Sequence, residues 1–309
     1  MRNRMRSTAF FLVGIWIFGG KLALATSWEL EPTSFGSRDK VEWLDAKTSK
    51  CWLRRTTLST EDPVDGRESV IVYDEYIPTR RDFATRASVV ILPPTGGETF
   101  IDRGYARSLC RRQVIGVIIK RWSHDTEAGM DLETHDRGFA RGIVAIRRVK
   151  HWILAERPKG KLGILGTSVG GLYAGLALSV DPDFSAGSLI VAGAPLATIL
   201  ARSTLPAVVK QRENRMKAFS IASQDEYEQL LMREIDLDML KAGNLLSSRP
   251  MLMIRSSTDT VVPASTQEVL WNAAGRPDGE VYSSNHQWSI VRAYLFQRTR
   301  VARFFAEVL

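Results

Sequence analysis

Short apolar runs alternate with segments of helical periodicity through most of the chain. The apolar runs lie at residues 88–92, 114–119, 161–165, 188–192 and 251–254, and residues 280–282 predict a further strand. Apolar side chains recur at three- and four-residue spacing over residues 105–112, 133–156 and 288–308. Short buried strands that alternate with helices predict an α/β fold, a mostly parallel sheet with helices on both faces.

The two ends of the chain add detail to this prediction. Residues 26–50 are polar and predict irregular structure, whereas residues 51–58 and 68–77 predict a pair of edge strands joined around Pro63 and Gly66. The closing segment predicts a helix with an inward apolar face. That face comprises Trp288, Val291, Leu295, Val301, Phe305 and Val308.

Residues 196–248 are too long for a single connecting helix between two strands. They contain a helix that should begin after the N-cap Ser223, with Glu226 at the third position, and stop near Gly243. Its apolar residues could dock on the core. The excess length also fits a helical cap over a substrate cleft, and we favour this cap insertion.

Residues 1–25 have the three parts of a secretory signal peptide. Arginines precede the apolar stretch 8–18, and Ala23-Leu24-Ala25 forms an A-x-A cleavage site. A membrane anchor is the alternative, but the apolar stretch is short against the roughly 20 residues that span a bilayer. We therefore expect an exported protein, periplasmic or secreted, in which residues 26–309 form one domain without a stable membrane anchor.

Removal of a signal peptide would lower the net charge of the chain. The formal net charge of +8 includes the signal's Arg2, Arg4, Arg6 and Lys21, so the mature chain carries only +4. Its arginine pairs are scattered, without the aromatic-interleaved basic stripe of a nucleic-acid site. The pattern therefore predicts no nucleic-acid partner.

The cysteine and histidine spacings predict no metal site. In an oxidising compartment Cys51 and Cys110 could form a disulfide. Two separate buried thiols fit the sequence equally well, because the sequence does not give the distance between the two residues.

The sequence KLGILGTSVGGLYAG at residues 161–175 carries the main candidate for chemistry. Gly166 to Gly170 match G-x-S-x-G, the nucleophile elbow, in which a buried strand turns sharply into a helix and exposes a serine. The flanking glycines suit a strained turn because they have no Cβ atoms to collide. Ser168 is the predicted nucleophile, and it needs a base and a carboxylate elsewhere.

Both partners follow predicted strands. Asp259 comes after the run 251–254, and His286 comes after the run 280–282. Loops at the carboxyl ends of parallel strands converge on the binding crevice of an open sheet. The order Ser168, Asp259, His286 is the order found in α/β-hydrolases.

The other histidines and acids have ordinary interpretations. His151 lies in a long helix and is expected to be structural or exposed. His124 and His135, beside Asp125 and Asp136, could line a pocket, but solvated loop positions are the favoured interpretation. Surface positions are likewise expected for Asp236 and Asp238.

From about residue 88 to residue 309 the chain resembles the α/β-hydrolase superfamily, and most nearly its dienelactone-hydrolase-like and prolyl-oligopeptidase-like serine esterases. Three features carry the resemblance: the GTSVGG elbow, the D-x-x-V-P sequence from Asp259 to Pro263, and Asn285-His286 before the terminal helix. The resemblance implies that Ser168 attacks a carbonyl carbon, His286 moves the proton and Asp259 orients the imidazole.

The resemblance also implies an oxyanion hole. One donor is the backbone N–H of Val169, the residue after the nucleophile. The second should come from the loop Pro93-Pro94-Thr95-Gly96-Gly97-Glu98, where we favour Gly97, with Gly96 and Glu98 as its neighbours. Here the sequence departs from the family's usual His-Gly.

These residues predict a serine hydrolase that cleaves a carboxylic ester of a small acyl substrate through an acyl-enzyme and needs no cofactor. A peptidase of the same fold is one alternative. A non-catalytic binding protein on a hydrolase scaffold is another, because fold alone does not fix activity.

Overall fold

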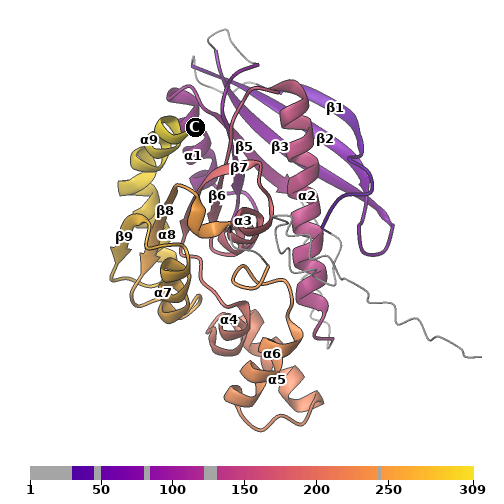
Figure 1. Cartoon of the computed structure of the whole chain (residues 1–309), viewed down its shortest axis with the longest axis vertical. Helices are drawn as coiled ribbons and strands as arrows, with labels where there is room; N and C mark the ends of the chain where they lie inside the picture. The colour runs from indigo at the N-terminus through magenta and orange to yellow at the C-terminus, as the bar shows by residue number, and fades with distance from the viewer. Residues whose placement is uncertain (1–29, 45–49, 80–83, 122–130, 243–244) are drawn as a thin grey trace, which may run out of the picture.

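A computed structural model describes residues 30–44, 50–79, 84–121, 131–242 and 245–309 (Figure 1). The predicted signal peptide and His124 with Asp125 lie outside these residues.

The described strands form one sheet in the order β1-β2-β3-β5-β4-β6-β7-β8-β9. Strands β1, β2, β3 and β5 pair antiparallel, and the strands from β5 to β9 in this order pair parallel. The strands are β1 Ser37–Leu44, β2 Cys51–Glu61, β3 Glu68–Pro78, β4 Ser88–Leu92, β5 Ile115–Arg121, β6 Leu162–Thr167, β7 Phe184–Ile190, β8 Met251–Ser256 and β9 Asp278–Tyr282. The predicted α/β sheet is therefore confirmed.

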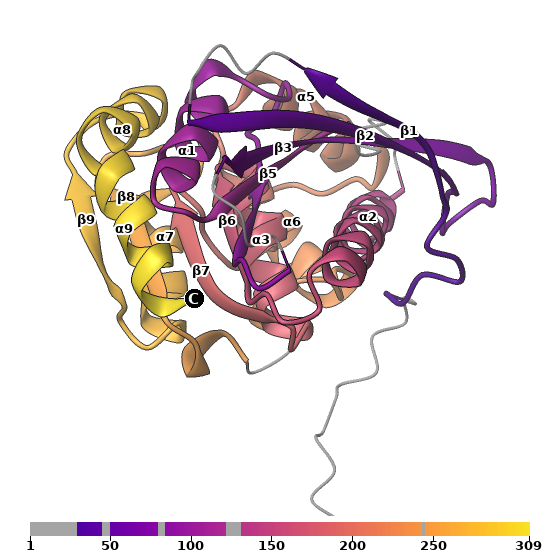
Figure 2. The same ribbon diagram turned by 90° about the horizontal axis from the view of Figure 1, so that it is seen from above.

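Helices cover both faces of the sheet (Figure 2). The helices are α1 Phe100–Arg111, α2 Thr134–Glu156, α3 Val169–Val180, α4 Leu196–Arg202, α5 Pro206–Ala218, α6 Gln224–Glu234, α7 Ala264–Ala273, α8 His286–Arg292 and α9 Arg298–Val308. A 3₁₀ turn spans Leu246–Ser248, and a π-helical turn spans Ala293–Gln297.

Two hydrophobic cores result, one on each face. Along β4, Val90 and Leu92 pack in the core shared with α2 and α3, while Val89 and Ile91 pack in the core shared with α1 and α9. Successive side chains of a strand point to opposite faces, so a continuous apolar run serves both cores.

The connections change direction at β4. From β4 the chain passes through α1 to β5, and from β5 it passes through α2 back across β4 to β6. The crevice outside the carboxyl ends of β4 and β6 is therefore a topological switch point, where open α/β sheets bind ligands. Thr95 follows β4 and Ser168 follows β6 at this position.

The structure corrects the prediction for residues 26–50, because β1 lies there as an edge strand. It pairs with β2 over its whole length, from Ser37 opposite Ser59 to Leu44 opposite Leu53. Its side chains are half-buried or exposed. Main-chain pairing rather than burial holds this strand, so its apolar pattern is weak.

The described residues of the segment between β7 and β8 form three helices instead of one (Figure 1). Helix α6 begins as predicted, since Ser223 Oγ accepts from the Glu226 N–H at 3.1 Å. It ends at Glu234 rather than near Gly243. The carboxylate of Asp136 accepts the N–H groups of Asp236 and Leu237, which turns the chain out of the helix.

Asp238 is buried instead of lying on the surface. Its carboxylate accepts from the backbone N–H of Leu196 and, at 2.8 Å, from that of Leu240. The three helices are therefore held at both ends by buried carboxylates. Asp238 holds Leu196 at the start of α4, and Asp136 of α2 holds the chain just after α6.

The closing helix also differs from the prediction. Val301 and Phe305 are buried, but Trp288 and Leu295 are 61% and 60% exposed. The π-helical turn at Ala293–Gln297 adds one residue to a helical turn and rotates the face that follows. A constant 3.6-residue period therefore fails across it.

Cys51 and Cys110 form a disulfide, with their Cα atoms 6.3 Å apart. It joins the start of β2 to the end of α1. Of the two arrangements that the sequence allowed, the bridged one is present. Among the described helices, none is both long and apolar enough to span a bilayer.

Candidate active site

Ser168 stands at the turn from β6 into α3 with a strained backbone, φ 54° and ψ −122°. A Cβ on Gly166 would lie 2.2 Å from Gly170 O, and one on Gly170 would lie 2.1 Å from Leu92 O. Only glycine fits either position. Helix α3 can therefore approach β4 closely and hold the serine at the switch point.

The structure brings Ser168, His286 and Asp259 together. Ser168 Oγ lies 2.9 Å from His286 Nε2, and His286 Nδ1 lies 2.6 Å from Asp259 Oδ2. All three side chains are buried. Because an ionised carboxylate only accepts, the neutral imidazole carries its proton on Nδ1, and Nε2 can accept from the serine hydroxyl.

Asp259 is held by further donors. Its Oδ1 accepts from the N–H groups of Val261 at 2.8 Å and Val262 at 3.0 Å. Its Oδ2 accepts from Gln267 Nε2 at 3.0 Å, and Gln267 Oε1 accepts from the Ser256 N–H at 2.9 Å. Gln267 is buried on α7. The sequence analysis did not identify it, because no sequence motif distinguishes this glutamine from an ordinary helical residue.

Val169 lines the cavity beside Ser168. It is the first residue of α3, so its N–H has no intrahelical acceptor and can donate to a ligand. This matches the position expected for an oxyanion donor.

Gly97 is not placed as expected. Its N–H donates to Pro94 O at 3.2 Å and closes a turn, and Gly97 does not reach the cavity. Thr95 lines the cavity instead, and its N–H makes no hydrogen bond to any other residue that the structure describes. Thr95 therefore replaces Gly97 as the candidate second donor.

The loop that carries Thr95 is anchored behind the site. The Glu98 carboxylate is buried and lies 2.8 Å from Lys120 Nζ of β5 and 3.6 Å from Arg103 Nη1 of α1. These contacts attach the loop to β5 and to α1.

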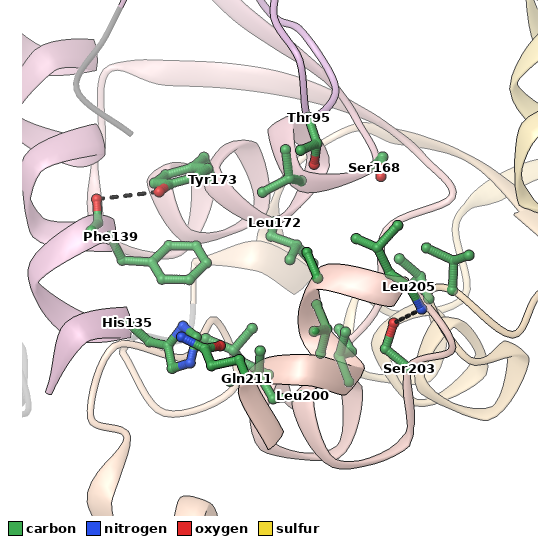
Figure 3. A pocket seen from close by; sticks show the side chains of 18 of the residues that line it. Thr95, His135, Phe139, Ser168, Leu172, Tyr173, Leu200, Ser203, Leu205 and Gln211 are labelled. Atoms are coloured by element: carbon green, nitrogen blue, oxygen red, sulfur yellow. Dashed lines mark hydrogen bonds between the residues drawn. The ribbon is translucent and has the colours of Figure 1, made fainter. Parts of the chain in front are cut away.

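A cavity of about 310 Å³ opens beside Ser168. Its walls are mostly apolar and come from α2, α3 and the segment between β7 and β8. Examples are Phe139, Leu172, Leu200 and Val208. Figure 3 shows Thr95 and Ser168 at one end, and His135 and Gln211 at the other.

His135 thus lines a cavity, contrary to the favoured interpretation of a solvated loop residue. Its Nε2 lies 2.8 Å from Nη1 of the buried Arg215 of α5. Burial, together with the Arg215 charge, lowers the pKa of His135 to about 3. His151, in contrast, stacks on Phe35 at 3.8 Å between ring centroids, a structural role.

The segment between β7 and β8 also contacts the loop that carries Asp259. The Thr204 N–H donates to Thr260 O at 2.9 Å, and their hydroxyls lie 2.8 Å apart. Thr260 follows Asp259 directly, so these two hydrogen bonds connect the segment that forms part of the cavity wall to the loop that holds the Asp259 carboxylate. In the described residues, no three His, Cys, Asp or Glu side chains are grouped to hold a metal ion.

No protein-family model matches the chain, and no curated protein matches its sequence. Solved structures do match its fold. An acetyl xylan esterase from Paenibacillus sp. R4 matches at a TM-score of 0.63 with 14% identity, covering 88% of this chain and 90% of that one.

Two further esterases match in the same way. A cold-adapted esterase from an Arctic intertidal metagenomic library gives a TM-score of 0.55 at 16% identity and covers 87% of this chain and 99% of that one. The Pyrococcus furiosus esterase Pf2001 matches with a TM-score of 0.55 at 16% identity, covering 91% of this chain and 99% of that one. Together with the parallel sheet and the strained serine turn, these likenesses show that the chain has the α/β-hydrolase fold.

Proposed function

We propose that this protein is a serine hydrolase that cleaves a carboxylic ester of a small acyl substrate. The observation that carries the proposal is the hydrogen-bonded series Ser168, His286, Asp259, with distances of 2.9 and 2.6 Å, at the end of an apolar cavity. The described structures of similar fold include several esterases, which agrees with this chemistry.

In the proposed mechanism the Ser168 oxygen attacks the ester carbonyl carbon while its proton passes to His286 Nε2. Asp259 holds the Nδ1 proton and stabilises the imidazolium. The tetrahedral oxyanion accepts hydrogen bonds from the N–H groups of Val169 and Thr95. His286 then protonates the leaving alcohol, and the acyl group stays on Ser168.

Water completes the cycle. His286 takes a proton from water as it attacks the acyl-enzyme, and returns that proton to Ser168 Oγ as the acid leaves. The apolar cavity receives the acyl chain, and residues 196–248 act as its cap. No step requires a cofactor.

Hydrolysis of p-nitrophenyl esters from acetate upward tests the proposal. We expect activity that falls at least about 10³-fold in Ser168→Ala and His286→Ala, since the residues of such a series act as a unit. His151→Ala is the matched control and should retain activity. Folded protein that hydrolyses no ester and does not react with a fluorophosphonate at Ser168 would contradict the proposal.

We also propose that the protein works in an oxidising compartment after export. The Cys51–Cys110 disulfide supports this, because such bonds persist mainly outside the cytosol. Mass spectrometry of the natural protein should find the two thiols oxidised and a mature chain that begins at Thr26. Reduced thiols in protein isolated with an alkylating agent would contradict the proposed location.

A further inference from the structure

The cavity has mostly apolar walls, but its end remote from Ser168 is polar. His135 of α2 and Gln211 of α5 both line this end, from helices that are far apart in sequence (Figure 3). A cavity built only for a saturated acyl chain would have no use for an imidazole and an amide at its end.

Arg215 fixes the protonation state of His135. A guanidinium has only donors, so His135 Nε2, 2.8 Å from Arg215 Nη1, must accept. The imidazole proton then lies on Nδ1. Protonation of Nε2 would abolish this hydrogen bond and place two cations together, which agrees with the lowered pKa of His135.

The His135 Nδ1–H has no acceptor among the residues that the structure describes, and in the same set the Gln211 amide makes no hydrogen bond. Both side chains are only half-buried and line the cavity. Leaving a donor unsatisfied when a ligand fills the cavity is unfavourable, because the donor loses its water partner and gains none. A ligand that brings an acceptor to this end avoids that cost.

We propose that the acyl group of the substrate carries a hydrogen-bond-accepting oxygen, such as a carbonyl or an ether, at the end remote from the ester, and that His135 Nδ1–H and the Gln211 amide recognise it. This inference rests on the proposed esterase function and names its substrate class. His135 and Gln211 are specificity residues here, since neither reaches the reacting atoms.

The test separates recognition from catalysis by using the Ser168→Ala protein. Calorimetry measures the dissociation constants of methyl alkanoates with five to nine acyl carbons, each paired with the ester of equal length that carries a ketone next to the terminal methyl. At the length that spans the cavity we expect the oxo ester to bind about tenfold more tightly, the effect of one added hydrogen bond.

Variants assign the preference to the two side chains. Gln211→Leu and His135→Phe should each reduce the tenfold ratio to threefold or less, without weakening binding of the plain alkanoate. Asn214→Leu, an exposed amide on the same helix, is the matched control and should keep the full ratio. Gln211→Leu keeps the test valid if His135→Phe fails to fold.

Equal binding of oxo and plain esters at every length would overturn the inference. So would a ratio that survives in both cavity variants, because the acceptor would then be recognised elsewhere. The p-nitrophenyl ester assay of the wild-type protein reports separately on the proposed function, since it depends on Ser168 and His286 and not on the polar end of the cavity.

Discussion

Gln267 Nε2 lies 3.0 Å from Asp259 Oδ2, the oxygen that also receives His286 Nδ1 at 2.6 Å. The same Gln267 side chain accepts from the Ser256 N–H at the end of β8. One buried amide therefore sets the position of the carboxylate relative to the sheet, and through it the orientation of His286.

Replacing Gln267 should impair catalysis more than binding. In Gln267→Met the carboxylate loses one donor and can rotate away from His286, so we expect kcat for p-nitrophenyl esters to fall about tenfold with KM within about twofold. Asn272→Ala, an exposed change on the same helix, should leave both constants unchanged. A rise in KM at constant kcat would show that Gln267 does not act by positioning Asp259.

A methyl group on Gly170 should be incompatible with the serine turn. Its Cβ would lie 2.1 Å from Leu92 O and 2.5 Å from Pro93 O, both backbone atoms. In Gly170→Ala we expect α3 to move away from β4, with a destabilisation of about 1–3 kcal/mol and loss of fluorophosphonate labelling at Ser168. Full labelling with an unchanged melting temperature would contradict this account of the turn.

The sequence alone predicts those features of the fold and the site that depend on patterns within one segment of the chain. Ser168 and Asp259 each follow a buried apolar strand, His286 follows the half-buried edge strand β9, and the carboxyl ends of parallel strands meet at one edge. The six strands from β4 to β9 were predicted for the same reason. The apolar runs of β4 to β8 are long enough to serve the cores on both faces, whereas β9 is an edge strand whose side chains are half-buried or exposed.

Residues whose roles depend on tertiary contacts were missed or misplaced. Gly97 looked suitable as a donor, but only the turn to Pro94 shows that its N–H is occupied and that Thr95 reaches the cavity. His135 lines the cavity because it meets Arg215, a residue 80 positions away. No pattern within one segment could indicate either contact.

The disulfide should contribute strongly to stability. Cys51 and Cys110 are separated by 59 residues, and closing a loop of that length restricts the unfolded chain by about 4 kcal/mol. We expect the Cys51→Ala/Cys110→Ala double variant to unfold at lower urea concentration by a corresponding amount. Wild-type protein in reducing buffer should behave like the double variant, and unchanged midpoints in both would contradict the prediction.

The Glu98 ion pairs should affect the loop that carries Thr95, the candidate second oxyanion donor. In Glu98→Gln the side chain keeps its size but loses its charge, so Lys120 and Arg103 hold the loop that carries Thr95 more weakly. We expect kcat to fall about tenfold while fluorophosphonate still labels Ser168, because the serine and its base are intact. Equal loss of labelling and turnover would instead indicate a general disturbance of the site.

The lowered pKa of His135 should make stability depend on pH. The unfolded chain binds a proton at this histidine near its ordinary value of about 6.5, whereas the folded protein does so only at about 3. Between these values the unfolded state holds more protons, so the free energy of unfolding should decrease as pH falls, by up to about 1.4 kcal/mol per pH unit. Above about pH 6.5 this contribution should be constant.

His135→Gln removes the titrating group, so its free energy of unfolding should change less between pH 6.5 and pH 4 than that of the wild-type protein. Urea unfolding at several pH values measures both slopes. His151→Ala serves as the matched control, because that imidazole packs against Phe35 rather than against a buried arginine. Parallel pH profiles for the wild-type and His135→Gln proteins would mean that His135 takes up its proton equally in the folded and unfolded chain, and Arg215 would then not hold it neutral.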